Sequence, residues 1–222
     1  MGGEAVHALG ARALWWGAGR ALIVADLHLG KCAHFRSLGV PAPLGSAEET
    51  LGRLGGLIEA FGAERVVVLG DLLHSGRWRD GETVAAVDRW MAARNRPEVM
   101  LIEGNHDRAA GELPSAWGVE VARGPHEFGP FALCHDPREG EGARKYALAG
   151  HIHPVARLYD RAGHGLRLPC FVVGPRAAVL PAFGAFTGGE PVRPRRGERV
   201  IVAGPDGVME ATPGAGRSLA DG

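Results

Sequence analysis

Five short motifs along this chain concentrate side chains that bind metal ions. Together they hold aspartate, asparagine and five of the ten histidines, which is a mixture of oxygen and nitrogen donors. Such a mixture suits first-row divalent metals better than Ca²⁺ or Mg²⁺, which take mainly oxygen ligands. The motifs are Asp26-Leu27-His28, Gly70-Asp71, Gly104-Asn105-His106-Asp107, Cys134-His135 and Gly150-His151-Ile152-His153.

The spacing within two of the motifs brings a pair of donors to one side of the chain. On an extended strand, residues i and i+2 point the same way, so Asp26 and His28 can share one ion. The same argument applies to His151 and His153, with Ile152 between them turned into the core. Each motif alone is a weak signal, because an isolated D-x-H or strand-end histidine is common. Their joint occurrence, in order, predicts a metal site.

The other motifs add a bridging group and a group for proton transfer. A carboxylate has two oxygens, so Asp71 can bridge two ions, although alone it could be a turn or helix-capping residue. Asn105 offers a neutral carbonyl oxygen as a ligand. His106 must point in a different direction and is therefore free to donate a proton or contact phosphate. Asp107 is expected to fix the tautomer of His106 and raise its basicity; the alternative for this tetrapeptide is an Asx turn.

Four of the five motifs follow directly on a short apolar run, which indicates the end of a buried strand. Ser46 and Glu49 have the spacing of a capping box before an amphipathic helix. The order β-α-β-α-β implies a largely parallel sheet, whose carboxyl edge is where open α/β sheets place their sites. The predicted elements are strands over 21–25, 66–69 and 99–102 and helices over 47–61 and 82–94.

The second half of the chain has short apolar runs between Gly and Pro turns, with little helical periodicity. This pattern indicates a second sheet, mixed or antiparallel. We expect residues 187–199 to form an exposed loop, residues 1–212 to form a single domain and residues 213–222 to be a flexible tail. The predicted strands are 119–121, 131–134, 146–149, 166–173, 177–180 and 200–203.

Composition narrows the possible classes of protein. The 222 residues carry no formal net charge, so no global field indicates a nucleic-acid partner and none excludes a local basic patch. Three scattered cysteines argue against a disulfide framework and favour a reducing cytoplasm, and Cys134 is interpreted as a small buried strand residue. No signal peptide is seen and no apolar run reaches about 18 residues, so no membrane association is expected. The glycine-rich motifs of nucleotide-binding folds are absent.

In this order the five motifs resemble the signature of the calcineurin-like metallophosphoesterases, over residues 26–153. The resemblance implies an α/β (α+β) four-layer sandwich, in which two mixed β-sheets are flanked by helices. It also implies two divalent metal ions, with Mn²⁺ favoured and Fe, Ni, Co or Zn as alternatives, and makes His106 an acid that binds no metal. Such ions activate water and stabilise the attacking and leaving oxygens of a phosphoester. One ion would take Asp26, His28, Asp71 and His153, and the other Asp71, Asn105, His135 and His151.

A narrower resemblance, over roughly residues 8–182, is to the ligase-associated DNA damage response endonucleases. His74 stands where the wider superfamily often has an acidic residue, which favours the narrower family. This resemblance implies DNA as the substrate and a functional association with an ATP-dependent DNA ligase, a helicase and an exonuclease. It rests on D-L-H-L-G-K from Asp26, H-F-R from His34, G-D-L-L-H-S-G from Gly70, C-H-D-P from Cys134 and G-H-I-H-P from Gly150.

The leading hypothesis is therefore a dinuclear metal-dependent phosphodiesterase that cleaves single-stranded or damaged DNA internally, in DNA repair. The alternative on the same site is a small-molecule phosphomonoesterase or nucleotide hydrolase, and a non-catalytic scaffold is a third. The short spacings around His135 leave no room for a large lid, which suits a polymer. Trp78 could stack on an unpaired base, although a place in the core is favoured. The side chains predicted to contact flanking phosphates, or else to be ordinary surface charges, are Lys31, Arg36, His74 and Arg77.

Overall fold

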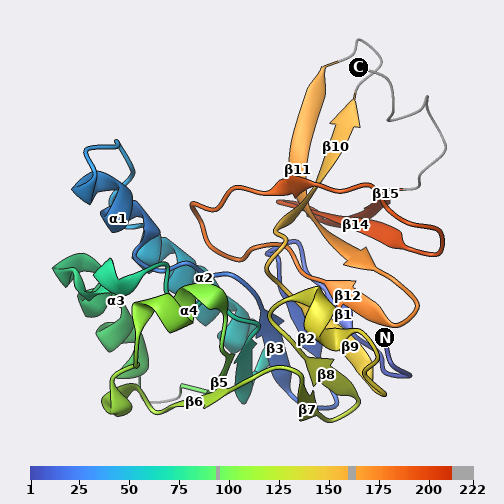
Figure 1. The fold of residues 1–222 in the computed structure, drawn as a ribbon, viewed down its shortest axis with the longest axis horizontal. Helices are drawn as coiled ribbons and strands as arrows, with labels where there is room; N and C mark the ends of the chain where they lie inside the picture. Colours follow the sequence, from blue (N-terminus) through green and yellow to red (C-terminus); the bar gives the residue numbers. More distant parts are fainter. Residues whose placement is uncertain (94–95, 160–163, 212–222) are drawn as a thin grey trace.

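The apolar runs of the amino-terminal half form the first sheet of the molecule (Figure 1). The computed structural model describes residues 1–93, 96–159 and 164–211. In the sheet, strands β3 to β6 are parallel, and β1 and β2 add an antiparallel edge. Strands β3 and β4 are buried on both faces, which explains their nearly continuous apolar sequences. The strands are β1 (His7–Ala8), β2 (Leu14–Trp16), β3 (Ala21–Val24), β4 (Arg65–Val68), β5 (Glu98–Ile102) and β6 (Val119–Ala122).

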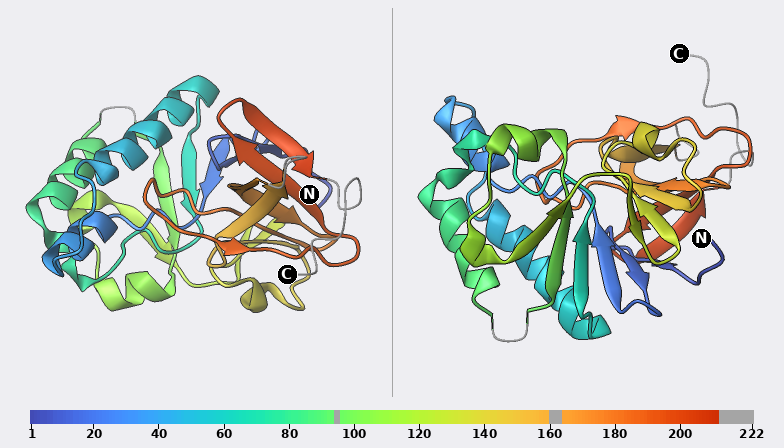
Figure 2. Two further views of the ribbon diagram at one scale, coloured as in Figure 1. Left: turned by 90° about the horizontal axis from the view of Figure 1, so that it is seen from above. Right: turned by 60° about the horizontal axis from the view of Figure 1, so that its bottom comes forward.

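Helices connect the parallel strands and cover one face of this sheet (Figure 2). Leu54 of α2 and Val66 of the sheet belong to one core cluster, which also includes Trp78. The indole N–H of the buried Trp78 donates to the carbonyl oxygen of Ala110 at 3.3 Å, so its predicted core position is confirmed. The helices are α1 (Lys31–Ser37), α2 (Ser46–Phe61), α3 (Gly81–Met91) and α4 (Asn105–Ala110), with 3-10 turns η1 (Gly76–Arg79), η2 (Ser115–Trp117) and η3 (Pro137–Gly140).

The second sheet packs on the opposite face of the first. Its strands follow the order β13-β10-β11-β12-β9-β8-β7, and β14 pairs with both β11 and β15. Ile23 and Val67 from the first sheet meet Phe131, Leu148 and Phe171 from the second in a shared buried core. The strands are β7 (His126–Phe128), β8 (Phe131–Leu133), β9 (Tyr146–Ala149), β10 (Pro154–Tyr159), β11 (Gly165–Val173), β12 (Ala177–Val179), β13 (Glu190–Pro191), β14 (Arg199–Gly204) and β15 (Gly207–Ala211).

This architecture, two mixed sheets flanked by helices, confirms the predicted fold class, but two local predictions are wrong. Ser46 does not cap α2: it is the first helical residue, Gly45 precedes it with a φ of 74°, and the N–H of Gly45 donates to a carboxylate oxygen of Glu82 at 2.7 Å. The predicted strand 119–121 belongs to the first sheet rather than the second, because it continues the parallel series beside β5 as β6.

Other boundaries shift by a few residues or fall outside the described chain. The second predicted helix ends at Met91, and the predicted loop 187–199 contains the short strand β13, which pairs with β10. The predicted tail, residues 213–222, lies outside the described residues. Cys134 is buried and carries a free thiol, as do the two other cysteines. None of the described helices is both long and apolar enough to cross a membrane.

Candidate metal centre

The predicted metal ligands converge at the carboxyl ends of strands from both sheets. Asp26 and His28 follow β3, and Asp71 follows β4. Asn105 begins α4, directly after the loop that leaves β5. His135, His151 and His153 lie beyond β8 and β9 of the second sheet. The carboxyl ends of these strands meet along the junction between the two sheets, as expected for a site in an open α/β sheet.

The first group of donors surrounds a buried carboxylate oxygen of Asp26. His153 Nε2 lies 3.4 Å from Asp26 Oδ1 and 3.2 Å from His28 Nε2, and His28 Nε2 lies 3.8 Å from Asp71 Oδ2. The other oxygen of Asp26 accepts the backbone N–H of His151 at 2.9 Å. Within the described chain, Asp26 Oδ1 is buried and accepts no hydrogen bond. A buried carboxylate oxygen left without a donor is costly, and a cation at this position would satisfy it.

The second group gathers around His135. His135 Nε2 lies 2.9 Å from Asn105 Oδ1, 3.0 Å from His151 Nδ1 and 3.5 Å from Asp71 Oδ1. Its other nitrogen, Nδ1, donates to the carbonyl oxygen of Leu69 at 3.0 Å, because a carbonyl can only accept. This hydrogen bond fixes the tautomer in which the Nε2 lone pair faces the cluster.

Asp71 lies between the two groups and directs one oxygen to each. Its Oδ2 faces His28, and its Oδ1 faces His135 and also accepts the backbone N–H of His106 at 2.9 Å. The carboxylate therefore has the position that a bridging ligand requires.

The backbone at these ligands is left-handed rather than extended, contrary to the prediction for the two i, i+2 pairs. Among the described residues, seven that are not glycine have a positive φ, and five of these are predicted metal ligands. Left-handed backbone is uncommon outside glycine, and such strain concentrates at functional sites. Because the simple alternation of a strand is lost, Ile152 does not enter the core and is 40% exposed. The five ligands are Asp26 (55°), His28 (48°), Asp71 (52°), His151 (70°) and His153 (50°).

Three glycines let the chain pass close behind the ligands. A Cβ on Gly70 would lie 2.1 Å from His135 Nδ1, one on Gly104 would lie 2.3 Å from Asp71 Oδ1, and one on Gly150 would lie 2.7 Å from Asp26 Oδ2. These distances are far below van der Waals contact. The glycine of each motif is therefore required by the packing of a ligand that belongs to another segment.

Burial sets the charge state of the centre. It lowers the pKa of His28 to about 2, helped by the neighbouring His153 and Lys31, and it raises the pKa of Asp71, an effect opposed by His135. Within the described chain, no lysine or arginine forms an ion pair with Asp26 or Asp71. Imidazole nitrogens around buried carboxylates that lack a lysine or arginine partner match the donor set of first-row divalent ions, so the residues fit the predicted metal pair.

His106 sits beside the ligands, and among the described residues no hydrogen bond engages its Nε2. Its Nδ1 donates to the carbonyl oxygen of His74 at 2.5 Å, and its ring stacks on the ring of His74 with centroids 5.0 Å apart. The ring also lies edge-on to the ring of His28, with centroids 4.9 Å apart. Because Nδ1 carries the fixed proton, Nε2 is the nitrogen that can take up and deliver a proton.

The interpretation that Asp107 orients His106 is wrong. The buried carboxylate of Asp107 instead accepts the backbone N–H groups of Asp71 at 2.7 Å, Leu73 at 3.0 Å and Gly104 at 3.0 Å. Burial raises its pKa to about 6 despite these donors. Asp107 therefore ties together the two loops that carry Asp71 and Asn105, and acts on the geometry of the ligands.

The predicted phosphate-contacting residues differ in their positions. His74 lies inside the centre, with Nδ1 3.5 Å from His28 Nδ1, and burial lowers its pKa to about 4. Lys31 lines a small cavity beside His28. Arg77 is exposed and donates to the hydroxyl of Ser37 at 3.1 Å. Arg36 forms an ion pair with Glu82 and donates to loop carbonyls, so its charge is already engaged within the fold.

Two features near the centre were missed from the sequence. Asp136 Oδ2 lies 3.9 Å from His151 Nε2, and hydrogen bonds from Arg138 lower the pKa of Asp136 to about 2. Phe186, 40% exposed, lines the same small cavity as His28 and meets Phe35 edge-to-face at 6.2 Å. The position of Asp136 directly after His135 was a usable signal for the first, whereas Phe186 lies far along the chain from every motif.

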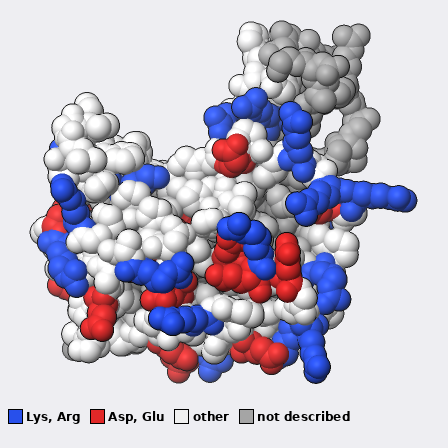
Figure 3. Space-filling view, in the orientation of Figure 1, with Lys and Arg blue, Asp and Glu red and all other residues white. Residues whose placement is uncertain are grey.

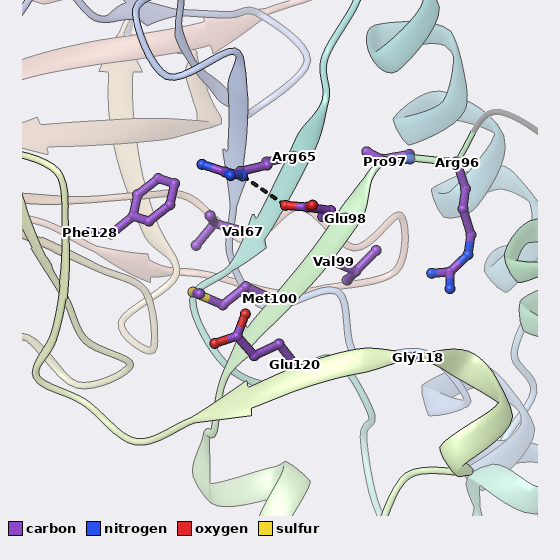
Figure 4. Close-up of a pocket in the computed structure, with 10 residues that line it drawn as sticks. All are labelled: Arg65, Val67, Arg96, Pro97, Glu98, Val99, Met100, Gly118, Glu120 and Phe128. Atoms are coloured by element: carbon purple, nitrogen blue, oxygen red, sulfur yellow. Dashed lines mark hydrogen bonds and ion pairs between the residues drawn. The ribbon is translucent and has the colours of Figure 1, made fainter.

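The centre opens onto a broad hollow in the surface. Figure 3 shows the molecule hollowed between the side of α1 and strands β10 and β11. The side chains of His151 and His153 are 33% and 20% exposed, so solvent reaches the ligands. A separate cavity of about 600 Å³ lies at the opposite, amino-terminal edge of the first sheet, where Arg65, Glu98 and Phe128 line it (Figure 4). None of the predicted site residues lines that cavity.

Comparisons with known proteins identify the family of this chain. The family model for calcineurin-like phosphoesterases matches residues 19–169. The crystal structure of nuclease MPE from Pseudomonas putida superposes with a TM-score of 0.80 at 40% sequence identity, covering 94% of this chain and 96% of that one. A conserved uncharacterized protein from Streptococcus pneumoniae is 14% identical, with a TM-score of 0.32 over 82% of this chain and 80% of its own. No curated protein matches the chain.

The family match covers both ligand groups, and the seven predicted ligand side chains meet in one cluster within it. The chain therefore belongs to the calcineurin-like phosphoesterase family and is a metal-dependent phosphoesterase.

Proposed function

We propose that this phosphoesterase is a phosphodiesterase that cleaves DNA internally, and that it acts on single-stranded or damaged DNA in DNA repair. The observation that carries the proposal is the convergence of two ligand groups on Asp71, in a centre that solvent reaches through the partly exposed His151 and His153. An open site admits a polymer that an enclosed pocket would exclude. The likeness to a nuclease, 40% identical over nearly the whole chain, supports the same substrate class.

We assign one ion to Asp26, His28, Asp71 and His153, and the other to Asp71, Asn105, His135 and His151. When bound, a pair of divalent ions supplies an activated water and neutralises charge on the phosphoryl oxygens. Mn²⁺ is our preferred identity for both, on the resemblance to the DNA damage response endonucleases.

The protein's own part in the reaction is proton transfer and positioning. We assign to His106 Nε2 the protonation of the leaving oxygen, since Nδ1 is held by the carbonyl of His74. General acid catalysis of this kind is worth about 10²–10⁴ in rate. Asp107 holds the two ligand-bearing loops in register through its backbone acceptor bonds.

A direct test is incubation of the purified protein with Mn²⁺ and circular single-stranded DNA. Because a circle has no ends, only internal cleavage linearises it. Absence of linear product across Mn²⁺, Ni²⁺, Co²⁺ and Zn²⁺ would contradict the proposal. A parallel comparison of an aryl phosphomonoester with a bis-aryl phosphodiester separates the alternative, since a strong monoester preference would indicate a small-molecule phosphatase.

The biological setting stays a prediction on the same resemblance. It comprises a cytoplasmic location and a functional association with an ATP-dependent DNA ligase, a helicase and an exonuclease.

A further inference from the structure

Strands β10 and β11 form a two-stranded ribbon that leads directly away from the metal centre. The β10–β11 ribbon is defined here as Pro154–Tyr159 with Gly165–Val173. Pro154 follows the predicted ligand His153, so the ribbon is anchored at the centre itself. The strands are antiparallel, and both project beyond the rest of the second sheet (Figure 1).

The two faces of the ribbon differ in character. On one face, Ala156 and Cys170 are buried with Val200 and Val202 in a separate apolar cluster. On the other face, Arg157 is paired directly across the ladder with Arg167, and both side chains are exposed. Figure 3 shows basic side chains over this part of the ribbon, beside the hollow.

The opposed arginines are unfavourable for the fold alone. Like charges directly opposite each other in an antiparallel pair are destabilising. Over the ranges that the structure describes, neither Arg157 nor Arg167 has an acidic ion-pair partner, whereas Arg199 on the neighbouring β14 is paired with Glu210. An unneutralised pair of guanidinium groups on an exposed face is a phosphate-binding arrangement, because each presents a planar fork of donors.

The charged face of the ribbon is turned toward the segment that passes over the metal loops. Arg167 donates to the carbonyl oxygen of Gly189 at 2.6 Å. The same segment begins at Gly184, whose N–H donates to the carbonyl oxygen of Asp26 at 3.1 Å. A Cβ on Gly189 would lie 2.3 Å from Val155, which shares the face of Arg157. One short stretch of chain therefore connects the arginine face with the ligand loop.

Besides Arg157 and Arg167, an arginine-rich segment adds positive charge along the edge of the ribbon. The N–H of Val192 donates to the carbonyl oxygen of Val155 at 3.0 Å, so the chain still runs beside β10 as it enters the arginine-rich residues 193–196. The same face ends in Tyr159, which is 57% exposed. Exposed tyrosine beside basic side chains is a combination used for unpaired nucleic-acid strands, because bases stack on the ring.

We propose that the arginine face of the β10–β11 ribbon binds the phosphates of a single DNA strand on one side of the bond that is cleaved. The proposal rests on the proposed function and names the surface that holds the polymer. At about 3.3 Å per residue, Arg157 lies roughly 13 Å along the strand from His153.

The test is a double variant, Arg157→Gln with Arg167→Gln, and binding of a fluorescent single-stranded DNA of about 20 nucleotides. Fluorescence anisotropy without added metal measures binding apart from cleavage. The matched control is Arg20→Gln with Arg65→Gln, which removes the same charge from the amino-terminal edge of the first sheet. We expect the ribbon variant to bind roughly tenfold more weakly, with the slope of log K against log salt reduced by about 1.4, and the control to match the wild type.

The outcomes separate this proposal from the proposed function. Equal affinity and equal salt dependence of the ribbon variant and the wild type would overturn the ribbon assignment, whether or not DNA is cut. An equal loss in both double variants would also overturn it, since it would reveal an effect of net charge. If the wild type binds DNA through the ribbon but fails to linearise the circle, the proposed function fails and the ribbon assignment stands. A melting temperature of the ribbon variant equal to or above that of the wild type, as removal of the like-charge pair predicts, establishes that its fold is intact.

Discussion

The Nε2 atoms of His28 and His153 face one another at 3.2 Å, although the two residues belong to loops from different sheets. Two imidazole nitrogens at this distance must share either a proton or a cation, because their lone pairs otherwise repel. Burial lowers the pKa of His28 to about 2, which disfavours a protonated imidazolium at His28 and leaves a neutral N–H···N hydrogen bond or a cation. The nearby Asp26 oxygen without a hydrogen-bond donor favours the cation.

Asp26→Asn is expected to raise the thermal stability of the metal-free protein and to lower the stabilisation that metal provides. The substitution removes a buried charge that raises the pKa of Asp71, and asparagine tolerates the left-handed backbone at this position. The melting temperature of the chelated protein should therefore rise by a few degrees, while the increase that Mn²⁺ gives the wild type should disappear. Thermal scans with and without EDTA measure both effects. Asp206→Asn, in an exposed turn, is the control, and equal Mn²⁺ stabilisation of Asp26→Asn and the wild type would contradict the ligand assignment.

Asp71→Ala is expected to abolish hydrolysis and lower the bound metal content, since both ligand groups depend on this carboxylate. Asp71→Asn is the companion variant, because it retains an acceptor for the N–H of His106 and tolerates the φ of 52°. Metal analysis after gel filtration should find less Mn²⁺ in both variants than in the wild type. Two tightly held ions in either variant would contradict the bridging role.

His106→Ala is expected to affect substrates according to their leaving group. DNA releases a poor alkoxide that needs a proton, so its cleavage should fall by about 10²–10⁴. A p-nitrophenolate leaves without protonation, so hydrolysis of bis-p-nitrophenyl phosphate should fall far less. Rates on the two substrates, at equal metal content, make the comparison. The same loss on both would assign His106 to binding or structure instead.

Gly70→Ala is expected to disrupt the centre through His135. The new Cβ would overlap the His135 ring, and the φ of 78° is unfavourable for alanine. The matched control is Gly52→Ala inside α2, where an added Cβ would meet no atom from outside its own stretch of helix within 4 Å, and the exchange should stabilise the helix by about 1 kcal/mol. Chemical denaturation and Mn²⁺ titration of both variants test this contrast. Normal metal affinity in Gly70→Ala would show that the loop can move aside.

Sequence patterns predicted the elements whose environment is uniform along their length. Strands β3, β4 and β5 are apolar runs because both of their faces are covered, and α2 shows its buried side as a periodic apolar stripe. The partner of a strand is not encoded in the strand itself, so residues 119–121 were given to the wrong sheet. Strand β10 was missed because its outer half alternates with exposed arginine and tyrosine and has no apolar run.

The motifs predicted which side chains converge on the candidate centre, but not the backbone conformation of these residues. The left-handed backbone at Asp26 and His28 is held by pairing with the loop after β4: Asp26 N–H donates to Gly70 O and His28 N–H to Asp71 O. Gly184, from a distant segment, also donates to the Asp26 carbonyl. Contacts between segments so far apart in the chain override local preference. Ser46 does not act as a cap because the helix begins at Ser46 itself, with Gly45 as the N-cap residue, and Glu82 of another helix accepts the Gly45 N–H.

The candidate ligands come from loops of both sheets, and this affects the stability of the protein. Asp71 follows a strand of the first sheet and His153 follows a strand of the second. An ion bound by both would therefore cross-link the two sheets. Metal binding would then raise the free energy needed to separate the two sheets. The same binding event that activates the enzyme would also protect it against proteolysis. Under metal limitation the protein would be both inactive and more readily degraded.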